Sequence, residues 1–507
     1  MATTPPTRLP PTTTTVLRTL TVAAFVVILN ETLLVNALPQ LMRSLQVDER
    51  AVQWLTTGFM LTLAVVIPTT GWLLQRLGTR SSFRLAMGLF VTGTLACALA
   101  PTFPLLLMGR VVQASGTAIM MPLLMTTLLG LVPPGARGRV MGNVTLTIAV
   151  APAMGPAVSG LVLRWLSWHW LFLLVLPIAV AVTLIGLRAL RVAQVPDPDG
   201  PRPGLDLVSV LLTAVGFGSL IYGLAEAGGE AGASSPLVPA PVALAVGAVG
   251  LGLFVWRQLV LQRSGEPLMD LRVLRVGQYA AALTLTSVAF MALMGVMILL
   301  PLYLQQVRGL SVLQTGLLLM PGGLVMGLMG PAVGRWFDRV GSRPLVIPGA
   351  VVLLASMVGM TVATLAAPWW AFLVCHVTAS IGLALMFTPA FTGGLGSLPP
   401  RLYPYGSAML GTVQQVAAAA GTALSIAVLS WRQGWLTGDG ASAGDALDGG
   451  VRAALLVGLV LSMVVVVLSS VVNSRPQTEA GAAGGPGAPG GPTDQDAPSH
   501  PAPTPAT

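Results

Sequence analysis

A single carboxylic acid lies in the middle of an apolar segment near the beginning of the chain. The stretch FVVILNETLLVNALP, residues 25–39, contains Glu31 directly after Asn30. A charged carboxylate at the centre of a bilayer costs about 2.5–3.5 kcal/mol on insertion scales, and such residues usually face a cavity or a partner. Because a carboxyl group binds and releases a proton, Glu31 is the first candidate for proton chemistry.

Two further ionisable residues lie within apolar segments, Arg110 and His376. Glu31 and Arg110 are predicted to lie at depths of about 12 Å and about 9 Å from the same side of the membrane, at 1.5 Å per residue. They could therefore meet across a central cavity, either as a proton-coupling pair or as a static structural pair. His376 titrates near neutral pH and is a second candidate, with a hydrogen-bonded packing role as the alternative.

The composition places these residues in a membrane protein. Of the 507 residues, 54% are hydrophobic and 8% are charged, whereas soluble domains carry about 25% charged residues. The net charge of +9 comes from arginines scattered between apolar runs, which fits loops at a membrane surface and not nucleic-acid binding. The sequence contains no P-loop, metal-ligand cluster or Ser/His/Asp arrangement, so we expect neither an enzyme nor a cofactor.

A transmembrane helix needs roughly 20 mostly apolar residues. This template predicts an all-α polytopic protein of about fourteen helices, at 17–38, 52–74, 81–101, 104–132, 139–163, 169–191, 206–225, 237–259, 278–304, 313–334, 344–366, 369–394, 408–431 and 453–473. The polar segment 1–16 and the Gly/Pro/Ala-rich segment 474–507 are predicted to be disordered.

The arginines predict the orientation. With both termini in the cytoplasm, nineteen arginines fall on the cytoplasmic side, six fall on the outer side, and Arg110 remains within a helix. Cytoplasmic loops carry an excess of arginine and lysine, so an even number of helices with both ends inside is favoured.

An internal repeat divides the chain. GWLLQRLGTR (71–80) and GRWFDRVGSR (334–343) share glycines and arginines at the same spacing, 263 residues apart. At nearly the same offset Arg110 matches His376, and Gly155 matches Gly421. We therefore predict two six-helix halves, 17–191 and 278–473, with two inserted helices at 206–259.

Two six-helix halves with such a loop in each resemble the major facilitator superfamily, and the inserted helices resemble its fourteen-helix drug:proton antiporter branch. The segments ETLLVNALP, RVVQASG, APAMGPAVSG and WHWLFLLVLP match that branch at the expected places. The chain departs from it by carrying Gln75 at an acidic position of the first loop, and by having Asn30 where the family has its acid, with Glu31 one residue later.

The resemblance implies a multi-pass protein of the bacterial plasma membrane that exports lipophilic drugs or antibiotics in exchange for protons. It would be driven by the proton-motive force and would act as a monomer. A dedicated exporter or importer of a single metabolite is the alternative.

The two loops are candidate gates that lock the cytoplasmic ends of the halves together, with plain positive-inside anchoring as the alternative. Asp338 is the stronger gate candidate because Gln75 cannot form a salt bridge. The candidate gating residues are Gly71, Arg76, Gly78, Arg80, Gly334, Asp338, Arg339, Gly341 and Arg343.

The fifth helix carries a stripe of small residues with two prolines, which favours close helix approach and a kink. In the resembled family this motif marks exporters, and here it comprises Ala151, Gly155, Pro156 and Gly160. The residues that line the substrate cavity are the hardest to predict from the sequence. Its candidate polar lining residues are Asn30, Gln53, Asn143, Thr147 and Gln414.

Overall fold

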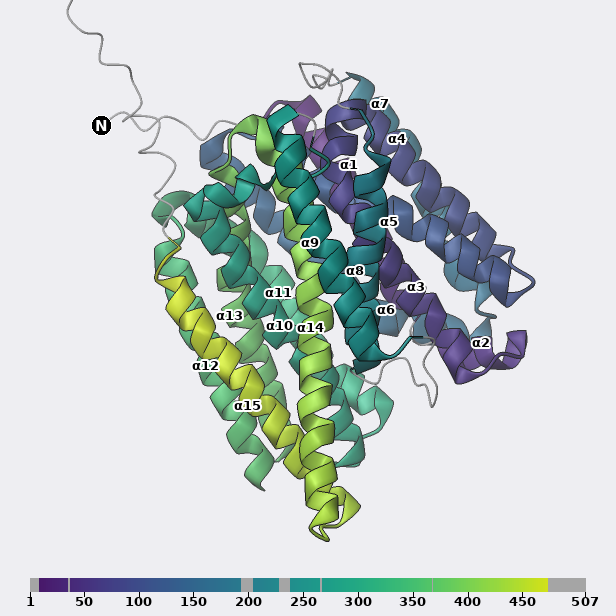
Figure 1. Cartoon of the computed structure of the whole chain (residues 1–507), viewed down its shortest axis with the longest axis vertical. Coiled ribbons are helices and arrows are strands. Elements are labelled where there is room, and N and C mark those ends of the chain that lie inside the picture. Colours follow the sequence, from purple (N-terminus) through teal and green to yellow (C-terminus); the bar gives the residue numbers. More distant parts are fainter. Residues whose placement is uncertain are drawn as a thin grey trace, which may run out of the picture.

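The computed structural model describes residues 9–34, 37–192, 204–227, 238–264, 267–366 and 368–472. Every regular element within these ranges is a helix, which confirms the predicted all-α fold class (Figure 1). Thirteen segments are long and apolar enough to cross a membrane. One of them, residues 51–98, holds two spans separated by a sharp bend at Gly78, so the described residues contain the predicted fourteen spans.

The N-terminal half contains six spans and a short surface helix. Its helices are α1 (Pro11–Leu33), α2 (Leu38–Leu45), α3 (Glu49–Val66), α4 (Thr70–Ala98), α5 (Phe103–Leu131), α6 (Arg137–Trp165) and α7 (His169–Val192), with the short 3₁₀ helices η2 (Ile67–Thr69) between α3 and α4 and η3 (Pro134–Ala136) before α6.

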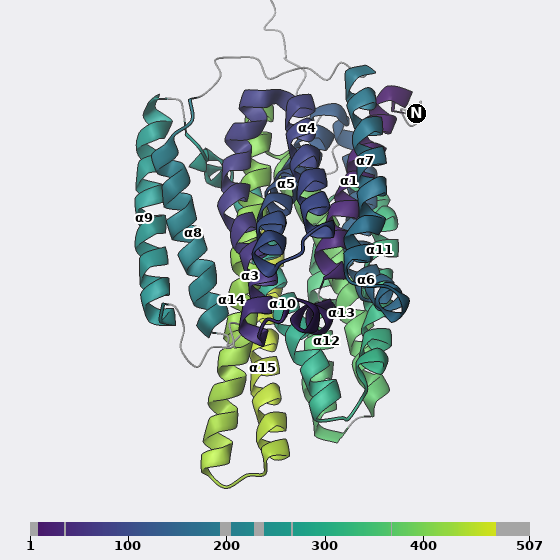
Figure 2. The same ribbon diagram turned by 90° about the vertical axis from the view of Figure 1, so that its right-hand side faces the viewer.

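The C-terminal half also contains six spans. Its helices are α10 (Gly277–Gln306), α11 (Val312–Val340), α12 (Arg343–Ala366), α13 (Trp369–Gly396), α14 (Tyr403–Gly438) and α15 (Ala443–Ser469), with η4 (Leu271–Arg275) before α10 and η5 (Pro400–Leu402) before α14. The inserted helices α8 (Leu207–Ala227) and α9 (Ala240–Ser264) form a hairpin outside the two halves, and α8 contacts both α3 and α14 (Figure 2).

Two glycines make the same turn at equivalent places in the halves. Gly78 bends α4 with φ 71° and ψ 171°, and Gly341 separates α11 from α12 with φ 79° and ψ −168°. A positive φ of this kind is open to glycine and strained for other residues. The repeated loop sequence therefore gives a repeated backbone turn.

The two halves meet along α6 and α11, whose backbones touch at glycines. An added Cβ at Gly142 or Gly330 would overlap the backbone of the other residue, and Gly138 and Gly334 are packed in the same way. We call the end of the bundle at which Asp338 meets Gly138 the Asp338 end. The halves diverge toward the other end, which lies at the bottom of Figure 1.

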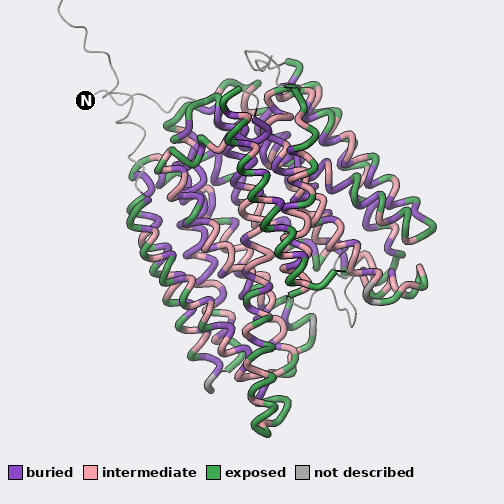
Figure 3. Tube along the Cα trace, in the orientation of Figure 1, coloured by how far each residue is buried: buried purple, intermediate pink, exposed green. Residues whose placement is uncertain are grey.

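Large apolar side chains cover the outer surface of the bundle. Exposed residues lie on the outward faces of the helices, and the buried residues lie between them (Figure 3). Among the exposed residues are Leu184, Leu207, Val249 and Val467, each more than half accessible. An apolar surface of this extent is the surface expected of helices that face lipid.

The beginning of the chain differs from the prediction. We expected disorder up to residue 16, but α1 begins at Pro11. Proline suits the first turn of a helix because its missing N–H has no helical partner there. The threonines that follow continue the helix, and the Thr15 and Thr19 hydroxyls donate to carbonyls one turn earlier. Residues 1–8 and the predicted disordered segment 474–507 lie outside the described residues.

Candidate functional site

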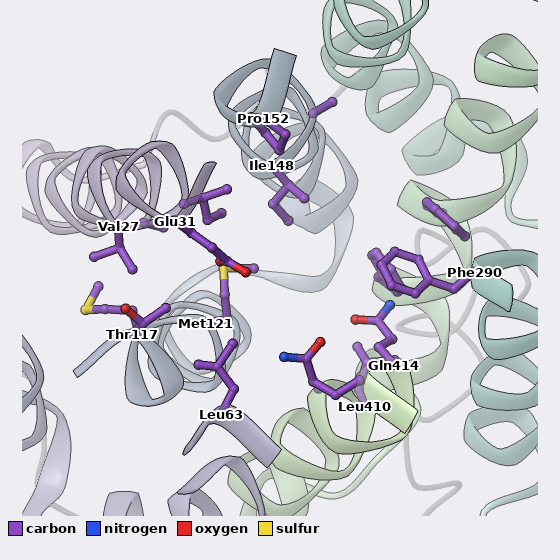
Figure 4. A pocket seen from close by; sticks show the side chains of 18 of the residues that line it. Val27, Glu31, Leu63, Thr117, Met121, Ile148, Pro152, Phe290, Leu410 and Gln414 are labelled. Carbon is purple, nitrogen blue, oxygen red and sulfur yellow. The ribbon is translucent and has the colours of Figure 1, made fainter. Parts of the chain in front are cut away.

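A cavity of about 360 Å³ lies between the two halves. Helices of the N-terminal half line one side of it, and α10, α11, α13 and α14 line the other (Figure 4). Its wall is mostly apolar, with the thioethers of Met120, Met121, Met125, Met294, Met297 and Met326 and the aromatic rings of Phe290, Phe387 and Phe391. Flexible thioethers adapt to ligands of different shape.

Glu31 is the one charged residue among those that line this cavity. Figure 4 shows its carboxylate pointing from α1 into the space between the halves, with Met121 directed toward it and Gln414 on the opposite wall. Ala24, Val27 and Ile28 line the cavity from the same helix. Positions three, four and seven residues apart share one face of a helix, so the face that carries Glu31 is otherwise apolar.

Arg110 forms no salt bridge with Glu31 in this conformation, although the two lie close enough to interact electrostatically across the N-terminal half. Its side chain is 2% exposed, and it donates to Gln113 Oε1 over 2.8 Å. The guanidinium carbon lies 4.0 Å from the centroid of the Phe59 ring. These contacts hold Arg110 inside the N-terminal half, and it is not among the residues that line the cavity. Glu31 forms no salt bridge within the described part of the chain.

His376 lies one turn from the cavity and does not line it. Its ring is 3% exposed and packs against Gly322 of α11, and it forms a hydrogen bond with the Leu319 backbone. The ring Nε2 has no hydrogen-bond partner among the described residues. Ser380, four residues along α13, lines the cavity.

Four of the five predicted polar lining residues lie elsewhere. Gln414 lines the cavity, but Asn30, Gln53, Asn143 and Thr147 do not. The reason is helix rotation, since successive residues differ by about 100°. Ile148 and Pro152 of α6 face the cavity, so Thr147 is buried beside them and Asn143 is exposed on another face. Asn30, next to Glu31, is buried inside its own half.

Four further polar residues, which were not predicted from the sequence, line the cavity. These are Thr117, Ser380, Ser407 and Gln415. Gln415 follows Gln414 directly, and both amides reach the cavity. Each of these residues lies in an otherwise apolar run, and a polar residue in such a run was the only signal available from the sequence.

The small residues of α6 pack against the helix that carries Glu31. A Cβ atom added at Gly155 would overlap Thr32 Oγ1, and Thr32 follows Glu31 in α1. Ala151 is fully buried on the same side of α6. Pro156 and Gly160 are exposed, and nothing lies within 4 Å of a Cβ added at Gly160. The stripe therefore makes one tight contact, at Gly155, which positions α1.

Asp338 joins the two halves. Its Oδ1 accepts a hydrogen bond from the Gly138 amide over 2.7 Å, and its Oδ2 accepts one from the Arg139 amide over 2.8 Å. These amides belong to the first turn of α6, where backbone N–H groups lack helical partners and a negative charge is favoured. Gly334, one turn before Asp338, packs directly on the Gly138 backbone.

The first loop makes a different contact at the same end. Gln75 Nε2 donates to the Arg401 carbonyl over 2.9 Å, and the Tyr405 hydroxyl lies 3.1 Å from Gln75 Oε1. The Tyr405 ring packs on Gly71. The predicted gating arginines Arg76, Arg80, Arg339 and Arg343 are exposed, and Arg76 lies 5.7 Å from the Trp72 ring centroid.

The chain is similar to known proteins over most of its length. The family model described as Major Facilitator Superfamily matches residues 20–422. The lincomycin resistance protein LmrB of Listeria monocytogenes is 38% identical over 447 residues, covering 87% of this chain and 93% of that protein. A multidrug resistance protein B homolog of Mycobacterium tuberculosis is 32% identical over 392 residues, covering 76% and 70%.

The fold also matches solved structures. The human organic anion transporter MFSD10 superposes with a TM-score of 0.63 at 15% identity, covering 91% of this chain and all of that one. At this identity the likeness shows the fold alone.

Proposed function

This chain belongs to the major facilitator superfamily, and on that premise we propose that it is a proton-coupled exporter of lipophilic drugs or antibiotics. The family and the fold are those of a transporter in a multi-pass membrane protein, as predicted, and the relatives are bacterial proteins named for resistance to lincomycin and to multiple drugs. Those names support drug efflux. The exchange for protons, the direction of transport and the action as a monomer are parts of the proposal.

The observation that carries the proposal is Glu31, the single charged residue in a cavity formed by both halves. An isolated carboxylate at membrane depth is costly and is usually functional. Protonation neutralises it and removes its attraction for a cationic or polar substrate. Glu31 therefore serves as the group at which proton and substrate compete.

The conformation supports a cycle in which the halves rock about this cavity. The halves are joined at the Asp338 end and diverge at the other. In this proposal Glu31 exchanges protons with the side toward which the halves diverge. With the Asp338 end in the cytoplasm, as the arginines favour, a proton entering from outside displaces the substrate and is later released inside. Each positive charge moving inward yields about 2.3 kcal/mol per 100 mV of membrane potential.

Arg110 and His376 have secondary roles in this proposal. Arg110 lies inside the N-terminal half in this conformation, and its Nε has no hydrogen-bond partner among the described residues. A rearrangement of Phe59 or Gln113 during the rocking motion would free the guanidinium to approach Glu31 and stabilise the ionised carboxylate. His376 is the next residue to test if Glu31 does not carry the proton.

The test is efflux from reconstituted liposomes under an imposed pH gradient. We expect Glu31→Gln, which resembles the protonated carboxyl, to bind substrate more weakly through the apolar wall. At saturating substrate it should still catalyse substrate exchange without a gradient but lose gradient-driven accumulation, while Glu31→Asp keeps part of that accumulation. Exchange without a gradient is the internal control, because it needs substrate binding and rocking but no net proton movement. Full gradient-driven transport by Glu31→Gln would refute the assigned role.

A carrier dedicated to one metabolite is the alternative. A panel of chemically different dyes and antibiotics separates the two functions, because a dedicated carrier transports one compound and ignores the rest. The apolar, methionine-rich wall favours broad specificity.

A further inference from the structure

The Asp338 end contains two contacts between the halves at equivalent positions. Gln75 and Asp338 occupy the same place in the repeated loops. The helices that they contact are equivalent as well, since η3 and α6 begin at Pro134 and Arg137, and η5 and α14 begin at Pro400 and Tyr403, 266 residues later in both cases. The halves are therefore joined by two versions of one contact.

In the first version, an aspartate accepts two backbone hydrogen bonds. Gly138 and Arg139 are the second and third residues of α6, and both donate to Asp338. A carboxylate at a helix N-terminus is stabilised by these unpaired amides and by the positive end of the helix dipole.

In the second version, one of the two donors is missing. The residues of α14 equivalent to Gly138 and Arg139 are Pro404 and Tyr405. Proline has no backbone N–H. A carboxylate at position 75 would keep one amide at most, and its second oxygen would lack that partner.

The glutamine makes a contact that needs no backbone amide. Its Nε2 donates to the Arg401 carbonyl, and its Oε1 accepts from the Tyr405 hydroxyl. The same hydroxyl lies 3.3 Å from the Pro267 carbonyl, in the segment that joins the inserted hairpin to the C-terminal half. Tyr405 is 5% exposed, so this polar group is held within the contact between the halves.

We propose that Gln75 and Tyr405 form an uncharged latch that holds α4 against α14 when the Asp338 end is closed, and that Pro404 makes an amide necessary at position 75. They are positioning residues, because neither carries substrate or proton. The glutamine at position 75, where the family has an acid, is then explained by the proline in the first turn of α14. This inference rests on the proposed rocking of the halves.

Packing alone is the competing explanation. The Tyr405 ring against Gly71 would then keep the contact closed, and the hydroxyl and Gln75 would contribute nothing. Tyr405→Phe keeps the ring and removes the hydroxyl, so it separates the two explanations. Tyr403→Phe is the matched control, because Tyr403 is also buried in the first turn of α14 and its hydroxyl makes no hydrogen bond to another described residue.

The measurement is the distance across this contact, which needs neither substrate nor a proton gradient. Spin labels are attached to cysteines that replace Arg84 of α4 and Arg401, both exposed, after Cys97 and Cys375 have been replaced by alanine. Arg401 contributes its carbonyl to the latch, so changing its side chain leaves that acceptor in place. The distance distribution reports the fractions of closed and open molecules.

We expect Tyr405→Phe to raise the ratio of open to closed molecules about fivefold, in keeping with the loss of one hydrogen bond, and Tyr403→Phe to leave it unchanged. Gln75→Asp should raise the ratio in the same way. Adding Pro404→Ala to Gln75→Asp restores the missing amide and should return the ratio to within about twofold of the wild-type value.

Two results would overturn the proposal: a wild-type distribution for Tyr405→Phe, or equal distributions for Gln75→Asp with and without Pro404→Ala. A failure of the proposed transport function would instead appear in the liposome assay and leave these distances unaffected.

Discussion

The carboxylate of Asp338 lies 2.7 Å from the Gly138 amide and so caps a helix of the opposite half. The contact joins the end of α11 to the beginning of α6, and the glycine pairs along these two helices let the backbones come close enough for it. Closure of the Asp338 end therefore depends on a hydrogen-bonded carboxylate as well as on packing.

Asp338→Ala should open this end. Hydrogen bonds to a charged acceptor are worth about 1.5–3 kcal/mol each, so losing two should raise amide hydrogen exchange at residues 138 and 139 more than tenfold. Hydrogen–deuterium exchange of peptides covering the start of α6 measures this. Asp445→Ala is the control, because Asp445 pairs with Ser442 at the start of α15 and makes no hydrogen bond to the N-terminal half among the described residues. Unchanged exchange in Asp338→Ala would mean that the glycine packing and the Gln75 contact keep this end closed without the carboxylate.

Gly155→Leu should impair transport more than expression. A leucine at this position would push α1 away through Thr32 and displace Glu31. Gly160→Leu is the matched control in the same helix, since a Cβ atom there meets open space. We expect efflux to fall at least tenfold in the first variant and to stay normal in the second, measured per amount of folded protein. Equal efflux by both would reduce the Gly155 contact to ordinary packing.

The Asp338 end should face the cytoplasm. Gly135 and Gly434 are exposed, lie at opposite ends of the bundle, and have nothing within 4 Å of an added Cβ, so both accept cysteine without strain. In intact cells a membrane-impermeant thiol reagent should label Gly434→Cys and leave Gly135→Cys unlabelled until the membrane is permeabilised. Reversed labelling would invert the proposed orientation.

Compounds with two positive charges should be poor substrates. The cavity offers one carboxylate, and a second buried cation would have no counter-charge there. Competition between matched mono- and bis-quaternary ammonium compounds in the liposome assay tests this, with at least a tenfold preference for the monovalent compound expected. Efficient export of the divalent compound would require an acid outside the described cavity wall.

Asp206 should make the inserted hairpin sensitive to acid. Arg257 donates two hydrogen bonds to this carboxylate, and they lower the pKa of Asp206 to about 2. A lowered pKa stabilises the folded state above the unfolded value of about 4, and this stabilisation is lost as the pH falls toward about 2. Asp206→Asn should therefore lower the unfolding temperature at pH 7, and the difference from the wild type should shrink below about pH 4. A difference independent of pH would show that the ion pair does not contribute.

The sequence by itself determined the helices, the two halves and the position of one acid, Glu31, within an apolar helix. Hydropathy and turn residues are local properties, so fourteen spans and the turns at Gly78 and Gly341 follow from short stretches of residues. A carboxylate in an apolar run is also visible locally, because its cost depends on the membrane and not on the neighbouring helices.

The tertiary structure decided which way each side chain points. A rotation of about 100° moves the next residue to another face, so packing alone places Glu31 in the cavity and Asn30 in the interior of its half. Packing also places the Arg110 side chain against Gln113 and Phe59. The similar depths of Arg110 and Glu31 in the membrane did not predict this. The pairing of Gln75 with Tyr405 joins residues 330 positions apart, and it arises only when the two halves close on each other.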